Sequence, residues 1–68
     1  MSVITEEKTG IINLFYDSDN GVIMESITNA SRDFNHPSAQ FEFIVGDSVS
    51  YTLITLPNGR TITKDVRK

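Results

Sequence analysis

The sequence predicts a small all-β barrel of five short antiparallel strands. Runs rich in valine, isoleucine, threonine and aromatic residues alternate with turns that contain glycine and asparagine. No stretch of ten or more residues repeats apolar positions at helical spacing. Short strands separated by such turns are typical of sandwiches and barrels.

Residues 9–23 predict the hairpin on which the other strands close. Its first strand is expected over about residues 8–16 and its second over about 22–26. The turn between them covers residues 17–21, and its Asn-Gly ending tolerates the positive φ angles of tight hairpins. Adjacent apolar pairs in the first strand indicate a bend that lets it serve both faces of a small closed sheet.

The clearest strand is expected over residues 48–55. There Val49, Tyr51 and Leu53 alternate with polar residues, which predicts one buried and one wet face. The other expected elements are a short strand near residues 32–36, a single helical turn at 37–40, an ambiguous apolar segment at 41–45 and a last strand at 61–66 after an Asn-Gly turn.

Length and composition limit the kind of protein. The 68 residues fit a single domain, expected over residues 8–68 after a flexible N-terminal segment 1–7. Without cysteine and with one histidine, the chain is expected to hold neither a zinc ion nor another cofactor. The start has no basic region and no long apolar run, so we expect no signal peptide, no membrane span and a cytoplasmic location.

The net charge of −3 argues against a dominant electrostatic attraction to phosphate. The basic residues nevertheless gather near the end of the chain, at Arg60, Lys64, Arg67 and Lys68. They could contact a phosphate backbone, or they could be the solvated side chains of a last strand.

Four segments match, in order, the motifs of a known family. They are 9–16 (TGIINLFY) at the position of G-x-V-K-W-F-N, 20–23 (NGVI) at F-G-F-I, 34–39 (FNHPSA) at F-V-H-F-S-A, and 45–51 (VGDSVSY) at E-G-Q-x-V-x-F. Together they resemble the cold-shock domain, a five-stranded OB-type barrel that binds single-stranded RNA and DNA. The resemblance implies a cold-shock-like barrel over nearly the whole chain.

Most stacking positions that the resemblance implies are replaced here. Family members stack bases on exposed aromatic rings, each worth about 1–3 kcal/mol. The family's first lysine, its tryptophan and three of its phenylalanines are replaced by Asn13, Leu14, Asn20, Val22 and Pro37. The residues left as nucleic-acid-binding candidates are Phe15, Tyr16, Phe34 and His36 for stacking, with Arg60 and Lys64 for phosphate.

Phe34 and His36 are the strongest of these candidates. Two residues apart on one strand, they are expected to face the same side, and both ring types can stack on a base. Alternatively, Phe34 fills the barrel and His36 is an ordinary surface residue. Phe15 could be exposed or buried, and Tyr16 fits a rim residue better than a stacking platform.

Two functions stay open, and neither is enzymatic, because no nucleophile motif, P-loop or calcium-loop spacing is present. The first is weak or altered binding of single-stranded RNA or DNA. The second is a barrel that no longer binds nucleic acid and serves as a protein-interaction or regulatory module. It would use the Leu14/Val22 face for a protein partner or for self-association. The apolar cluster of Phe41, Phe43 and Ile44 could either plug the barrel or meet a partner.

Overall fold

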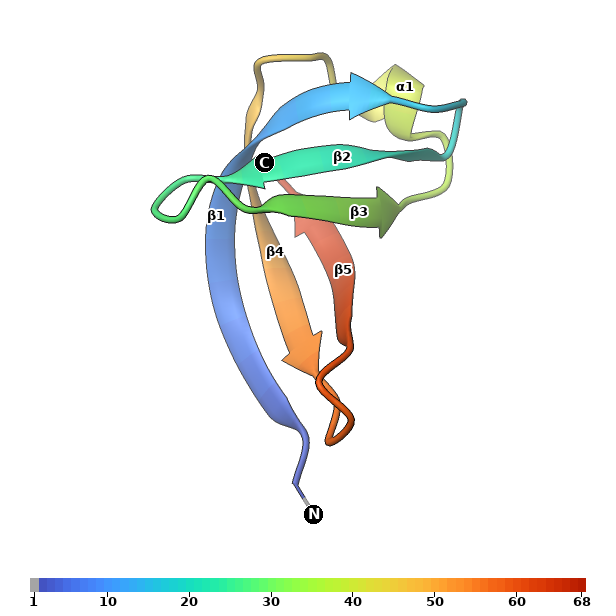
Figure 1. Cartoon of the computed structure of the whole chain (residues 1–68). Coiled ribbons are helices and arrows are strands. Elements are labelled where there is room, and N and C mark those ends of the chain that lie inside the picture. Colours follow the sequence, from blue (N-terminus) through green and yellow to red (C-terminus); the bar gives the residue numbers. More distant parts are fainter. Residues whose placement is uncertain (1) are drawn as a thin grey trace.

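The computed structural model describes residues 2–68 and shows one strongly curled antiparallel sheet (Figure 1). Its elements are β1 (Ile4–Phe15), β2 (Asn20–Glu25), β3 (Ser31–Asn35), the helical turn α1 (Ala39–Glu42), β4 (Ser48–Thr55) and β5 (Thr61–Arg67). Within these residues no helix is long and apolar enough to cross a membrane. The predicted class, a small five-stranded antiparallel β domain, is confirmed.

The sheet is a half-barrel. Its strand order is β3-β2-β1-β4-β5, so β3 and β5 are the two edge strands. They approach each other but form no hydrogen-bonded ladder. The arrangement is compatible with OB-like folds, with the curl open between β3 and β5.

β1 begins at Ile4, earlier than the expected start near Lys8. Its first part pairs with β4 and its last part pairs with β2, so this one strand joins the two halves of the sheet. The expected boundary between a flexible segment 1–7 and the domain therefore falls inside a paired strand. Met1 lies outside the described residues.

A bulge at Asn13 changes which side of β1 faces the core. The register with β2 shifts between Ile12 and Leu14. As a result Ile12 points into the core, Leu14 points outward, and Phe15 points inward again. This irregularity is the physical basis of the adjacent apolar pairs in the sequence.

The first turn differs from the predicted Asn-Gly hairpin. Asn20 and Gly21 belong to β2, and residues 16–19 make the turn. The Asp17 carboxylate closes it by accepting two backbone hydrogen bonds of 2.9 Å. Gly21 is required for packing, because a Cβ there would lie 2.5 Å from a carbonyl oxygen of β1. The second predicted Asn-Gly turn is correct, with Gly59 at φ 88°.

The hydrophobic core lies inside the curl. It includes the three alternating residues of β4, as the sequence predicted. Its members are Ile12, Ile23, Phe34, Ala39, Phe43, Val49, Tyr51, Leu53 and Val66.

One carboxylate, Glu25, is buried at the edge of this core and ties three strands together. Only 3% of Glu25 is exposed. It accepts hydrogen bonds from the hydroxyl of Thr28 (2.6 Å), the hydroxyl of Tyr51 (3.2 Å) and the guanidinium of Arg32 (3.3 Å). The Thr28 bond, assisted by the other two, holds the pKa of Glu25 below its usual 4.5 although burial opposes this.

We predict that Glu25→Gln destabilises the fold in a pH-dependent way. A folded-state pKa below 4.5 means that the ionised carboxylate stabilises the fold above that pH and loses this effect as pH falls through the lower folded value. At neutral pH the variant should unfold about 1–3 kcal/mol more easily, because buried donors lose a charged acceptor. Urea unfolding measured from neutral pH to about pH 3 should show that the difference in free energy of unfolding between wild type and variant becomes smaller in acid. A gap that stays constant over this range would contradict the network.

Candidate functional site

Phe34 and Phe15 lie on the inner side of the sheet. Phe34 is 3% exposed, and Phe15 is half-buried and packs edge-on against it, with ring centroids 6.4 Å apart and planes at 67°. The hypothesis that Phe34 offers an exposed stacking face is wrong for this structure, and the alternative, that it fills the barrel, is correct. The cause is the register, which places Phe34 opposite the inward-facing Gly21.

His36 is half-buried at the end of the core. Its ring meets Phe43 edge-on at a centroid distance of 5.2 Å, and its Nε2 lies 2.7 Å from a carboxylate oxygen of Glu42. The expectation that Phe34 and His36 share one side of the chain is confirmed. That side is the core side, so His36 caps the interior and leaves only part of its ring for a ligand.

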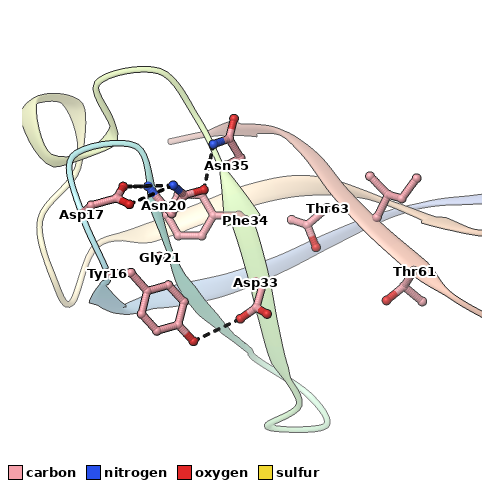
Figure 2. A pocket seen from close by; sticks show the side chains of 10 residues that line it. Tyr16, Asp17, Asn20, Gly21, Asp33, Phe34, Asn35, Thr61 and Thr63 are labelled. Atoms are coloured by element: carbon pink, nitrogen blue, oxygen red, sulfur yellow. Dashed lines mark hydrogen bonds between the residues drawn. The ribbon is translucent and has the colours of Figure 1, made fainter.

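The other three predicted binding residues are exposed but scattered. Tyr16 is 65% exposed at the rim and reaches towards β3, where its hydroxyl donates to Asp33 at 3.4 Å (Figure 2). Arg60 lies in the β4–β5 turn, and Lys64 projects from β5. Lys64 shares a hollow of about 630 Å³ with His36. The structure therefore brings one stacking candidate and one phosphate candidate together.

The polar groups of the first turn form a hydrogen-bonded chain (Figure 2). The side-chain amide of Asn35 donates to Asn20 at 2.8 Å, and that of Asn20 donates to Asp17 at 3.0 Å. Hydrogen bonds from the backbone N–H of Asp19 and from the side-chain amide and backbone N–H of Asn20 lower the pKa of Asp17. Among residues 2–68, no group of three or more His, Asp or Glu side chains is placed to hold a metal ion.

The outward-facing side of β1–β3, which we call the outer face, has a different chemistry from a nucleic-acid surface. Strand register and alternation place these residues on it: Ile11, Leu14, Asn20, Val22, Met24, Ser31, Asp33 and Asn35. Within the described chain, the outer face carries no lysine or arginine and one carboxylate, that of Asp33. It therefore offers phosphate no charge partner.

Aliphatic side chains form a strip along the outer face. Ile11 is paired with Met24, and Leu14 is paired with Val22. Ile11 and Leu14 are exposed, Met24 is half-buried, and Val22 is buried although it lies outside the core cluster. Of the Leu14/Val22 pair that the sequence suggested for a partner, Leu14 is exposed and Val22 is buried, and the accessible apolar surface of the strip comes from Ile11, Leu14 and Met24. Sequence reasoning missed Ile11 and Met24 because their side of the sheet depends on the bulge and the register.

A second apolar patch lies in the connection between β3 and β4, on α1 and the residues that follow it. Phe41 is 86% exposed and Ile44 and Val45 are exposed beside it, whereas Phe43 is buried in the core. The cluster is therefore divided. Phe43 closes the end of the half-barrel, whereas Phe41, Ile44 and Val45 leave apolar surface exposed.

Comparisons of the chain with protein-family models, with curated proteins and with solved structures find no match in any of the three. The class that the geometry defines is a small antiparallel half-barrel compatible with OB-like folds.

We predict that Phe34→Ala lowers the free energy of unfolding by about 3–5 kcal/mol, because it leaves a cavity under Phe15. For a domain of this size such a loss can unfold most of the protein. Tyr16→Ala, which removes an exposed ring of similar size, is the matched control and should cost far less. Denaturant unfolding of both variants checks this, and equal stability of the two would place Phe34 on the surface instead.

Proposed function

We propose that this chain is a protein-interaction module that binds through its outer face. The observation that carries the proposal is the strip of Ile11, Leu14 and Met24, bordered by polar residues and by Asp33. Apolar strips with polar margins are typical of protein–protein contact surfaces.

The requirements of nucleic-acid binding favour a protein partner over single-stranded RNA or DNA for the outer face. Affinity for single strands comes from basic side chains that neutralise phosphates and from aromatic rings that stack on bases. The described residues of the outer face include no lysine or arginine, and because Phe15 and Phe34 point inward, the aromatic ring next to this face is that of Tyr16 at the rim. Aliphatic side chains next to a carboxylate suit a protein surface better than a polyanion.

Weak binding of single-stranded RNA or DNA, as the cold-shock resemblance implies, is the second candidate. Its support is the hollow of about 630 Å³ that His36 and Lys64 share. Lys64 has no ion-pair partner among residues 2–68. Glu7 and Asp65 line the same hollow, however, and Arg67 there is already paired with Glu7, so its net attraction for phosphate is small.

We predict that the double variant Ile11→Lys/Leu14→Lys loses the protein partners that the wild-type chain retains from an extract of its own cells. Two lysines would interrupt the apolar strip without touching the core, because both positions are exposed. The matched control is Ile27→Lys, which makes the same chemical change at a 90% exposed position in the β2–β3 turn. Amide NMR spectra would establish that all variants are folded.

Retention of the same partners by the double variant, or an equal loss in Ile27→Lys, would contradict the proposal. Titration with short single-stranded DNA and RNA at low salt separates the two candidates. Saturable shifts centred on His36 and Lys64 would support nucleic-acid binding, and under the protein-interaction proposal these amides stay unchanged.

A further inference from the structure

We propose that the open side between β3 and β5, the seam, binds an extended peptide segment in which aliphatic and basic residues alternate. The segment would add to β3 as a further antiparallel strand. This surface is separate from the aliphatic strip of the outer face, so the inference does not depend on the proposed function.

The backbone of β3 offers unused hydrogen-bonding groups to the seam. The backbone N–H of Glu25 donates to the carbonyl of Ala30, and the N–H of His36 donates to the carbonyl of Asp19, both at 2.8 Å. These two hydrogen bonds lie at opposite ends of the β2–β3 ladder. Because hydrogen-bonded and non-hydrogen-bonded pairs alternate in an antiparallel ladder, Arg32 and Phe34 use their N–H and C=O groups on β2. The backbone groups of the alternate residues, Ser31, Asp33 and Asn35, point away from β2 towards β5.

The facing edge of β5 is also unpaired. A bond of 2.8 Å from the N–H of Leu56 to the carbonyl of Arg60 sets the same alternation in the β4–β5 ladder. It directs the backbone groups of Thr61 and Thr63 away from β4 and into the seam. Edge strands with free N–H and C=O groups are templates for pairing with another strand.

There is room for a ligand where the two edges diverge. Hollows of about 510 Å³ and about 320 Å³ lie there, and each is lined by residues of both strands. Asp33, Thr61 and Thr63 line both hollows, and Figure 2 shows the two threonines on β5 facing the β3 side of the larger one. An added strand would pair with β3 and use β5 as its second wall.

Side chains at the seam specify the chemistry of the strand. Asp17 and Asp33 line the larger hollow, and no basic residue among 2–68 does so. Arg32, which lines the smaller hollow, is already paired with Glu25 at 3.3 Å. On the inner side the strand would meet Phe34 at the edge of the core, whereas the exposed Ile62, which pairs with Ile54, lies on the opposite side of β5. Successive side chains of a strand point to opposite sides, so lysine or arginine would alternate with aliphatic residues.

A second copy of the chain fits the seam less well. Pairing two β3 edges about Asp33 would place the Asp33 carboxylates of both copies on neighbouring strands, where like charges repel. The chain as a whole carries a net charge of −3, which adds to this repulsion. A basic peptide carries positive charge, so the seam attracts it instead.

The test is an amide NMR titration of the full chain with the capped peptide Val-Lys-Val-Lys-Val, at low salt and up to millimolar concentration. We expect saturable shifts at residues 31–35 and 61–63. The same peptide with glutamate in place of lysine should bind more weakly. Two N-methylated versions, one methylated on the valines and the other on the lysines, should bind with different affinities. Only one set of peptide amides can face β3, and methylation of that set removes the hydrogen bonds to it.

A pair of matched variants tests the charge. Asp33→Asn should weaken binding of the lysine peptide about two- to fivefold, the range of an exposed ion pair. Asp65→Asn removes the same charge from β5 outside the seam and should leave binding unchanged.

Several outcomes would overturn the inference. They are the absence of saturable shifts, shifts confined to the aliphatic strip of Ile11, Leu14 and Met24, equal binding of both N-methylated peptides, and equal effects of the two aspartate variants. A free protein that is dimeric by light scattering, with slowly exchanging amides at Ser31, Asp33 and Asn35, would show that a second copy fills the seam instead.

Discussion

The bend of β1 at Gly10 is the constraint on which the rest of the structure depends. Gly10 is paired with Glu25 of β2 and with Val49 of β4, so both halves of the sheet meet at this residue. A Cβ at this position would lie 2.6 Å from the Ile23 side chain and 2.6 Å from the carbonyl oxygen of Met24. Close approach of β1 and β2 there curls the sheet, and Glu25 fixes the curl by its hydrogen bond to Tyr51.

The curl decides which chemistry faces outward. It turns Phe15, Phe34 and the ring of His36 towards the interior, where Phe15 packs on Phe34 and His36 packs on Phe43. What remains on the outer face is an aliphatic strip, two asparagines and the carboxylate of Asp33, with the exposed ring of Tyr16 at the rim. A surface of this composition favours protein contacts, because the affinity of a nucleic-acid site depends on charge neutralisation and base stacking. The same curl stops short of closure, which leaves the seam between β3 and β5.

The sequence was sufficient to predict those strands and turns that depend on local residue patterns. The strand at 48–55 has the predicted bounds, because strict alternation marks both its faces, and the turn at Gly59 forms because glycine supplies the positive φ. It failed where the outcome depends on partners distant in the sequence. The Asn20-Gly21 pair looks like a turn locally, but Gly21 is needed for close packing against β1. The side occupied by Phe34 follows from the β2–β3 register, and the open seam follows from the placement of two strands about thirty residues apart.

Hydrogen exchange of the backbone amides tests the half-barrel most directly. If the sheet is open between β3 and β5, the amides of Ser31, Asp33, Asn35, Thr61 and Thr63 exchange rapidly. Those of Arg32, Phe34, Ile62 and Lys64 exchange slowly, because they bond to β2 or β4. An alternating pattern along both strands is the result that this account predicts. Uniform protection of both strands in a monomeric sample would mean that the barrel is closed, and it would contradict both the open half-barrel and the seam.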